Sequence, residues 1–161
     1  MGQVDEHAQV AGLPRHVIGV AGVVVDDSGR ALAVRRREPA RWELPGGALE
    51  DGELLLDGLR REVAEEIGLD VDPLRLTGVY QNMRLGPVAL VFLCRRLGGI
   101  ERLSDETQAW RWMTRTEVET ELPPAWATRF TDALDVWSAG PAAGPAVPVR
   151  AHDGANLLRP G

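Results

Sequence analysis

Residues Gly46–Leu69 read GGALEDGELLLDGLRREVAEEIGL, and they carry the most specific pattern in the sequence. Its second half has apolar residues at helical spacing, so we expect a helix that begins near Asp51 and ends at Gly68. One arc of about 120° on this helix carries the side chains that we expect to face the core, because successive residues turn by about 100°. These side chains are Leu55, Leu56, Leu59, Val63 and Ile67.

Glu62, Glu65 and Glu66 lie on an adjacent arc, at the edge of the apolar stripe. Like charges three or four residues apart destabilise a helix by about 0.2–0.5 kcal/mol per pair. Arg61 offers partial compensation, and a divalent cation would offer more. Three carboxylates beside the carbonyls of a glycine loop are hard oxygen ligands that suit Mg²⁺ or Mn²⁺. The carboxylates alone leave two interpretations open, a metal site and a solvated acidic face.

The spacing from Gly47 fits the pattern G-x5-E-x7-R-E-U-x-E-E-x-G-U, in which U is an aliphatic residue. Nine defined positions over 23 residues are filled, by Gly47, Glu53, Arg61, Glu62, Val63, Glu65, Glu66, Gly68 and Leu69. This stretch resembles the Nudix box of the Nudix hydrolases. The preceding Leu44-Pro45-Gly46 is similar to the family's usual lead-in.

The resemblance implies a metal site for Mg²⁺ or Mn²⁺ made by the carbonyl of Gly47 and the carboxylates of Glu62, Glu65 and Glu66. Glu65 and Glu66 match the principal ligands of the family. Glu62 matches a position that either binds metal or orients the attacking water. Glu53 matches a position that usually braces Arg61 and can support a metal, so both belong to the expected catalytic set.

The resemblance also implies a reaction, the attack of water on phosphorus in a nucleoside diphosphate linked to a group X. The expected substrate is a small nucleotide or nucleoside diphosphate derivative, and nucleoside triphosphates, nucleotide sugars and ADP-ribose stay open. A homodimer is left open as well, since many family members dimerise. The alternative function is a non-catalytic Nudix-fold module that binds nucleotides or regulates, although such modules usually have a degraded box.

Candidates for the remaining chemistry lie outside the box. Glu106, in LSDETQAWRWM, has a placement similar to the loop acid of MutT-like members and is a candidate ligand or general base, with a solvated loop acid as the alternative. Arg35, Arg36 and Arg37 end the second expected strand near the glycine loop, where family members often bind substrate phosphate. Arg84, in a later loop, is a further candidate for substrate binding.

The rest of the chain favours a single α/β domain, an α/β/α sandwich with a mixed sheet and a loop–helix–loop metal site. We expect strands that pair as a hairpin at 16–27 and 31–37, further strands at 74–83, 87–97 and 109–114, and helices at 115–122 and 125–137. The expected organisation is an N-terminal tail at 1–14, the domain at 15–138 and a flexible Pro/Ala/Gly-rich tail at 139–161.

Aromatic residues are expected to pack rather than to bind ligands. Helical spacing places Trp126, Phe130, Leu134 and Trp137 on one stripe that would pack on the sheet. Trp42 and Tyr80 could stack a base, but packing is the simpler interpretation.

Composition excludes several other functions. The net charge of −6 argues against a nucleic acid polymer or an anionic membrane as partner. The chain has no run of about 18 apolar residues, which a membrane span requires. Its single cysteine, Cys94, lies in an apolar run and is expected to be a buried, inert thiol. A reducing cytoplasm is the expected location.

Overall fold

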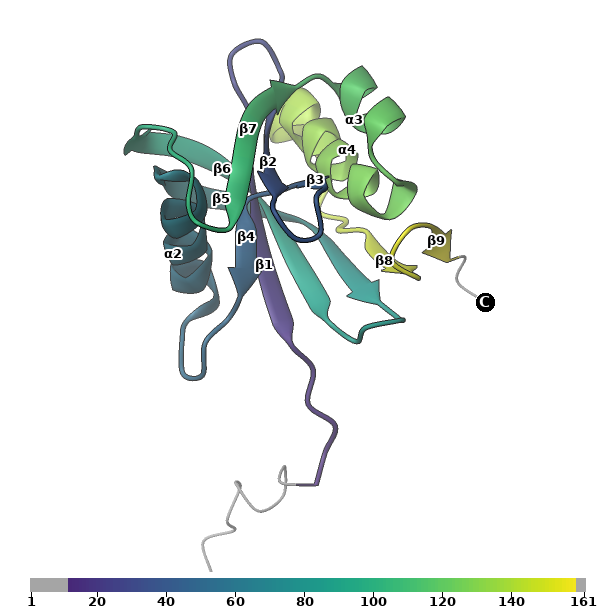
Figure 1. The fold of residues 1–161 in the computed structure, drawn as a ribbon. Helices are drawn as coiled ribbons and strands as arrows, with labels where there is room; N and C mark the ends of the chain where they lie inside the picture. The colour runs from purple at the N-terminus through teal and green to yellow at the C-terminus, as the bar shows by residue number, and fades with distance from the viewer. Residues whose placement is uncertain (1–11, 159–161) are drawn as a thin grey trace, which may run out of the picture.

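The computed structural model describes residues 12–158, with two β-sheets between helix α2 on one side and helices α3 and α4 on the other (Figure 1). The larger sheet has the strand order β4-β1-β6-β5-β8-β9, and the smaller has the order β3-β2-β7. The helices are α2 (Leu55–Ile67), α3 (Arg115–Glu121), α4 (Pro124–Ala139) and the short 3-10 helix η1 (Gly140–Ala142). The strands are β1 (Ile18–Val24), β2 (Ala31–Arg36), β3 (Trp42–Glu43), β4 (Gly46–Ala48), β5 (Leu69–Asn82), β6 (Val88–Gly99), β7 (Thr107–Met113), β8 (Val149–His152) and β9 (Leu157–Leu158).

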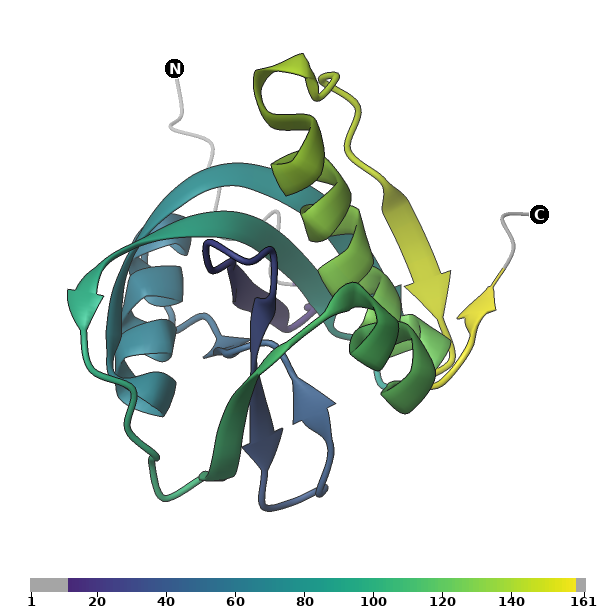
Figure 2. The same cartoon turned by 90° about the horizontal axis from the view of Figure 1, so that it is seen from above.

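The predicted α/β/α sandwich with a mixed sheet is confirmed. Strand β1 runs parallel to β6 and antiparallel to β4, while β5 and β6 form a long antiparallel pair. Both faces of the larger sheet are covered, which explains why β1 is apolar almost throughout. Figure 2 looks along the molecule from above, with α2 and α4 on opposite sides of the strands.

Two apolar clusters hold the helices on the sheets. Leu59, Val63 and Ile67 of α2 pack against one set of strand side chains, and Phe130 and Leu134 of α4 pack against another. Cys94 lies buried in the α2 cluster, and burial raises the pKa of its thiol to about 12. The prediction of a buried thiol is therefore confirmed.

The predicted hairpin of β1 and β2 is wrong. The two strands follow each other through a turn but share only the bridge between Val25 and Ala31, and then they enter different sheets. The physical reason is burial on both faces of β2. Leu32 and Val34 enter the α2 cluster, while Ala31 and Ala33 enter the α4 cluster, so β2 lies between the two layers rather than beside β1.

The aromatic stripe of α4 packs only in part as predicted. Phe130 and Leu134 are buried, and Trp126 packs on the core at its edge. Trp137 is 41% exposed, with its ring over Gly29 in the turn between β1 and β2. A helix that extends past the sheet leaves its last turn outside the core.

Part of the segment at 139–161 that was expected to be a flexible tail forms a strand of the larger sheet. Val149–His152 form β8, which pairs parallel with β5 and extends the larger sheet. Arg150 binds both carboxylate oxygens of buried Asp132, at 2.6 and 2.8 Å, and Tyr80 donates its hydroxyl to the same carboxylate at 2.8 Å. This network joins β8, β5 and α4, and the Pro- and Ala-rich composition did not reveal it. Within residues 12–158, no helix combines the length and the apolar character needed to cross a membrane.

We expect Asp132→Ala to lower the free energy of unfolding by about 2–4 kcal/mol, because it leaves a buried tyrosine hydroxyl and an arginine without their acceptor. Urea denaturation measures this. The matched control is Asp135→Ala on the same helix, whose carboxylate is exposed, with an expected loss below about 1 kcal/mol. Equal losses in the two variants would contradict a structural role for the buried carboxylate.

Candidate functional site

The helix of the box begins later than predicted. Helix α2 starts at Leu55 rather than near Asp51, because Gly52 has a positive φ of 77° that an α-helix excludes. Glu53 holds this turn by accepting the N–H of Glu50 at 3.0 Å. At the other end, Gly68 closes the helix in the left-handed conformation with φ 79°, as predicted.

Arg61 is the centre of an ion-pair clamp beside α2. Its guanidinium donates to both carboxylate oxygens of Glu53, at 2.7 and 2.9 Å, to Glu62 at 2.9 Å and to Glu65 at 3.1 Å. It also donates to the carbonyl of Ala48 at 3.3 Å. The hydrogen bonds from Arg61 lower the pKa of Glu53 to about 2. Arg61 and Glu53 therefore tie the helix to the loop that precedes it.

Glu66 is the most deeply buried carboxylate of the box. The residue is 6% exposed, and its Oε2 accepts the N–H of Gly46 at 2.7 Å. Its Oε1 is buried without a hydrogen-bond partner among the described residues. Burial raises the pKa of this carboxyl to about 7, and the charges of Glu43 and Glu62 add to the effect. Glu66 Oε1 therefore lacks a hydrogen-bond donor among the described residues, although the positive charge of Arg36 acts on the carboxylate and lowers its pKa in part.

The glycine pair makes room for this arrangement. A Cβ on Gly46 would overlap the backbone of β1, and a Cβ on Gly47 would overlap the carboxylate of Glu62. Glu62 itself is partly buried, and burial raises the pKa of its carboxyl in spite of the hydrogen bond from Arg61. The two glycines thus let β4 approach β1 and the carboxylates of α2 closely.

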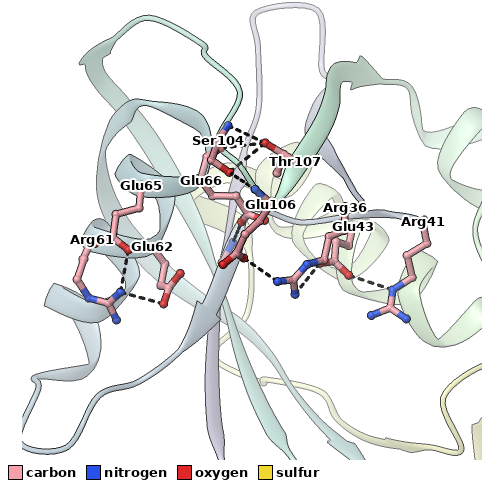
Figure 3. A network of polar contacts seen from close by, with 11 residues as sticks. Arg36, Arg41, Glu43, Arg61, Glu62, Glu65, Glu66, Ser104, Glu106 and Thr107 are labelled. Carbon is pink, nitrogen blue, oxygen red and sulfur yellow. Dashed lines mark hydrogen bonds and ion pairs between the residues drawn. The ribbon is translucent and has the colours of Figure 1, made fainter. Parts of the chain in front are cut away.

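Glu65 and Glu106 are placed differently from Glu66. The side chain of Glu65 is 62% exposed and is turned to Arg61. Glu106, in the loop before β7, is exposed and accepts from Arg36 Nη2 at 3.0 Å. Figure 3 shows Glu106 reaching toward the space between Glu62 and Arg36. The structure therefore brings together Glu62, Glu66 and Glu106, but leaves Glu65 at the side of the clamp.

Sequence reasoning missed Glu43. This residue is 6% exposed, and its two oxygens meet Arg36 Nη1 at 3.4 Å and Arg41 Nε at 3.0 Å (Figure 3). It lies between the expected strand at 31–37 and the helix of the box, directly before the Leu44-Pro45-Gly46 lead-in. The available signal was its position next to that lead-in, but its burial depends on β2 and could not be read locally.

A cavity of about 400 Å³ opens beside the box. Near the box it is lined by Arg36, Arg41, Glu43, Gly46 and Gly47, and elsewhere by residues that include Asn82, Arg84, Trp126, Arg129 and Gly154. Of the four predicted substrate arginines, Arg36 and Arg84 line this cavity. Arg35 and Arg37 are exposed and do not belong to its lining.

The residues of the site fit a divalent cation. Glu66 Oε1 is a buried oxygen without a donor, Glu62 lies close enough to raise its pKa, and carboxylates are the ligands that Mg²⁺ and Mn²⁺ prefer. Within residues 12–158 no three acidic, histidine or cysteine side chains are already arranged around one point. A full set of ligands therefore requires a side chain such as Glu65 to turn away from Arg61.

Comparison with known families matches residues 15–134 to the NUDIX domain. The chain therefore belongs to the Nudix family and is a hydrolase of that family, as the box predicted. A MutT-like protein of Streptomyces ambofaciens is 48% identical over 148 residues, which cover 92% of this chain and 91% of that protein. The human 8-oxo-dGDP phosphatase NUDT18 is 41% identical over 87 residues, which cover 50% of this chain but only 26% of that protein.

Solved structures agree on the fold. An ADP-ribose pyrophosphatase of Streptococcus suis superposes with a TM-score of 0.65 at 23% identity and covers 86% of this chain and 100% of its own. A MutT Nudix hydrolase of Burkholderia pseudomallei superposes with a TM-score of 0.63 at 26% identity and covers 76% of this chain and 98% of its own. The sandwich around the box is therefore the fold that these proteins share.

The burial of Glu66 predicts a pH dependence of stability in the metal-free protein. Its pKa is about 7 in the folded chain, above the ordinary value of 4.5, so the folded state binds this proton more tightly and stability falls as the pH rises between these values. Glu66→Gln removes the loss. We expect the variant to be more stable than the parent at pH 8 by about 1–3 kcal/mol and nearly equal to it at pH 4.

Denaturation of both proteins at the two pH values, in the presence of a chelator, measures the difference. Glu119→Gln, at an exposed position of α3, is the control that should show no such dependence on pH. A difference between Glu66→Gln and the parent that stays constant from pH 4 to pH 8 would contradict the buried, unpaired carboxylate.

Proposed function

We propose that this protein hydrolyses a diphosphate linkage in a small nucleoside diphosphate derivative, with water as the attacking group. The observation that carries the proposal is the buried Glu66 carboxylate, which has one oxygen without a partner beside a cavity lined by arginines. A negatively charged diphosphate and this carboxylate repel each other unless a cation lies between them. The intact box and the family membership support the same reaction.

The proposed ligands of a divalent ion, Mg²⁺ or Mn²⁺, are Glu66, Glu65 and the carbonyl of Gly47, and of the two roles expected for Glu62, ligand or partner of the attacking water, we propose the second. A bound ion of this kind neutralises charge that develops on the phosphate oxygens and lowers the pKa of water. Glu66 is held for this task by the N–H of Gly46, and Glu65 is within reach through a turn of its side chain away from Arg61.

Glu62 is the proposed general base. Arg61 fixes its Oε1, while Oε2 lies against Gly47, and partial burial raises the pKa of the carboxyl toward the range in which it can accept a proton. Glu106 is proposed in a supporting role, because it is exposed and is engaged by Arg36. Arg61 and Glu53 brace the helix that presents Glu62.

Arg36 and Arg84 are the proposed contacts to substrate phosphate. Both line the cavity, and Arg36 lies next to the box carboxylates, held between Glu43 and Glu106. A guanidinium in this position can bind phosphate oxygens through two N–H groups. Arg35 and Arg37 lie outside the cavity lining and have weaker support for this role.

For the substrate, we propose a nucleoside di- or triphosphate, oxidised guanine nucleotides included. The relatives named as 8-oxo-dGDP phosphatase and as a putative 8-oxo-dGTP diphosphatase support this class. The cavity of about 400 Å³ lies within the range of small-molecule sites, roughly 300–1,000 Å³. The structural neighbour that is an ADP-ribose pyrophosphatase keeps ADP-ribose in the panel to be tested.

Chromatographic detection of the nucleoside monophosphate formed from dGTP, 8-oxo-dGTP, 8-oxo-dGDP, ADP-ribose and a nucleotide sugar tests this function, because the second product differs between them (pyrophosphate, phosphate or a sugar phosphate). We expect activity only with Mg²⁺ or Mn²⁺. Glu66→Gln should lower kcat/KM by about 100- to 1,000-fold through the loss of a metal ligand, and Glu62→Gln by about 100- to 10,000-fold through the loss of the base. Glu106→Gln should cost less than tenfold, and the control Glu119→Gln should be unchanged.

Two outcomes would contradict the account. If Glu106→Gln were the more damaging variant and Glu62→Gln nearly silent, the base would be the loop acid. If the parent protein cleaved no substrate of the panel yet bound nucleotides, the alternative of a non-catalytic nucleotide-binding module would replace hydrolysis.

A further inference from the structure

Arg129 of α4 lines the cavity without an acidic partner. Arg36, Arg41 and Arg150 each form an ion pair with a carboxylate, whereas no carboxylate among residues 12–158 pairs with Arg129. Its Nε is buried and has no hydrogen-bond partner there. Burial is strong enough to lower the pKa of this guanidinium to about 10. A largely desolvated cation without a carboxylate partner is costly, so the position calls for an explanation.

His152 does not supply the missing acceptor. Its Nε2 lies 3.1 Å from Arg129 Nη2, and its Nδ1 accepts the N–H of Gly154 at 3.1 Å. A neutral imidazole has one acceptor nitrogen and one N–H. If Nδ1 accepts from Gly154, then Nε2 carries the proton and faces another donor. The guanidinium of Arg129 therefore has N–H groups left for a ligand.

Two aromatic rings hold the guanidinium of Arg129 in place, although it has no carboxylate partner among the described residues. Its carbon lies 4.3 Å from the ring centre of Trp126 and 5.4 Å from that of Tyr80. Trp126 is fixed in turn, because its Nε1 donates to the carbonyl of Gly154 at 3.0 Å. His152 and Gly154 lie beyond the residues that match the NUDIX domain, so a segment outside that match builds this end of the cavity.

A continuous row of polar groups joins this end to the box. The charge of Arg36 acts on the Glu66 carboxylate and favours its ionised form. Glu43 lies between Arg36 and Arg41, and the guanidinium of Arg41 lies 3.7 Å from the ring centre of Trp126. Figure 3 shows the first part of this row, from Glu66 to Arg41. A substrate whose diphosphate lies at Glu66 can therefore extend along the cavity toward Arg129.

We propose that Arg129 is a specificity-determining residue, and that its free N–H groups bind a hydrogen-bond-accepting oxygen at the end of the substrate away from the reacting diphosphate. The inference rests on the proposed function for the orientation of the substrate. The accepting oxygen belongs either to a nucleobase carbonyl or to a second phosphate. Trp126 and His152 are positioning residues that hold the guanidinium.

Calorimetric titration of the protein in Mg²⁺ with four probes tests this without any need for hydrolysis, since none of the probes has a diphosphate linkage. The probes are 8-oxo-dGMP, dGMP, dAMP and inorganic phosphate, which have two, one, no and no base carbonyls. If Arg129 binds a base carbonyl, Arg129→Met should weaken binding of the two guanine nucleotides by about 10- to 100-fold and leave dAMP unchanged. If it binds phosphate, all four probes should weaken by a similar factor.

The matched control is Arg95→Met, an exposed arginine of β6 that does not line the cavity, and it should bind every probe as the parent does. Arg129→Lys keeps the charge and most of the stem, and should show a smaller loss because an ammonium lacks the planar fork. Thermal unfolding checks that each variant is folded. If Arg129→Met does not fold, the binding of the probes is compared between the parent and Arg129→Lys.

Binding of all four probes by the Arg129 variants at the parent's affinity would overturn the proposal. Formation of the nucleoside monophosphate from dGTP and dATP, measured in parallel, separates it from the proposed function. A parent protein that binds the probes through Arg129 but hydrolyses nothing would contradict only the hydrolysis. A parent that hydrolyses nucleotides, with kcat/KM for dGTP and dATP unaffected by Arg129→Met, would contradict only the role of Arg129.

Discussion

Glu66 holds a carboxylate in the interior of the protein with a single hydrogen bond, from the N–H of Gly46, and with one oxygen unsatisfied. Such a group is unfavourable in a chain without a cation, and the neighbouring acids Glu43 and Glu62 make it more so. Much of the local architecture serves to keep it there. The glycine pair brings β4 against α2, and Arg61 clamps the helix to its preceding loop.

The packing of the helices on the sheets also fixes the residues at the two ends of the cavity. Helix α2 is fixed on the sheets by one apolar cluster and α4 by another, so the carboxylates and Arg129 stand on two rigid elements with strands between them. Between these two helices, Arg36 and Arg41 line the cavity and form ion pairs with Glu43. A rigid frame of this kind can hold both ends of a substrate at fixed separation, which favours reaction at one bond.

The parts of the site that depend on local sequence spacing could be predicted, and the parts that depend on tertiary contacts could not. Glu62, Glu65, Glu66 and Arg61 could be placed from the sequence, because helical spacing and the box pattern fix their relation. The orientation of Glu65 toward Arg61 could not, since a rotamer depends on competing partners. Glu43 was missed because only the pairing of β2 with β3 buries it.

The same reasoning explains the errors in the fold. Apolar runs correctly indicated β1, β2, β5, β6 and β7, but the separation of β1 from β2 depends on how their side chains divide between two clusters. Helix α2 starts late because Gly52 adopts a conformation that a helical pattern does not reveal. Strand β8 escaped prediction because its stability comes from Asp132, in a distant helix.

The proposed function depends on metal binding by the unpaired oxygen of Glu66. A crystal structure of the protein soaked in Mn²⁺, with anomalous difference density recorded at the manganese edge, shows whether this oxygen is a ligand. We expect a peak at about 2.0–2.3 Å from Glu66 Oε1, in contact with Glu65 and lost in Glu66→Gln. A manganese peak elsewhere, with Glu66 Oε1 still without a partner, would contradict the account.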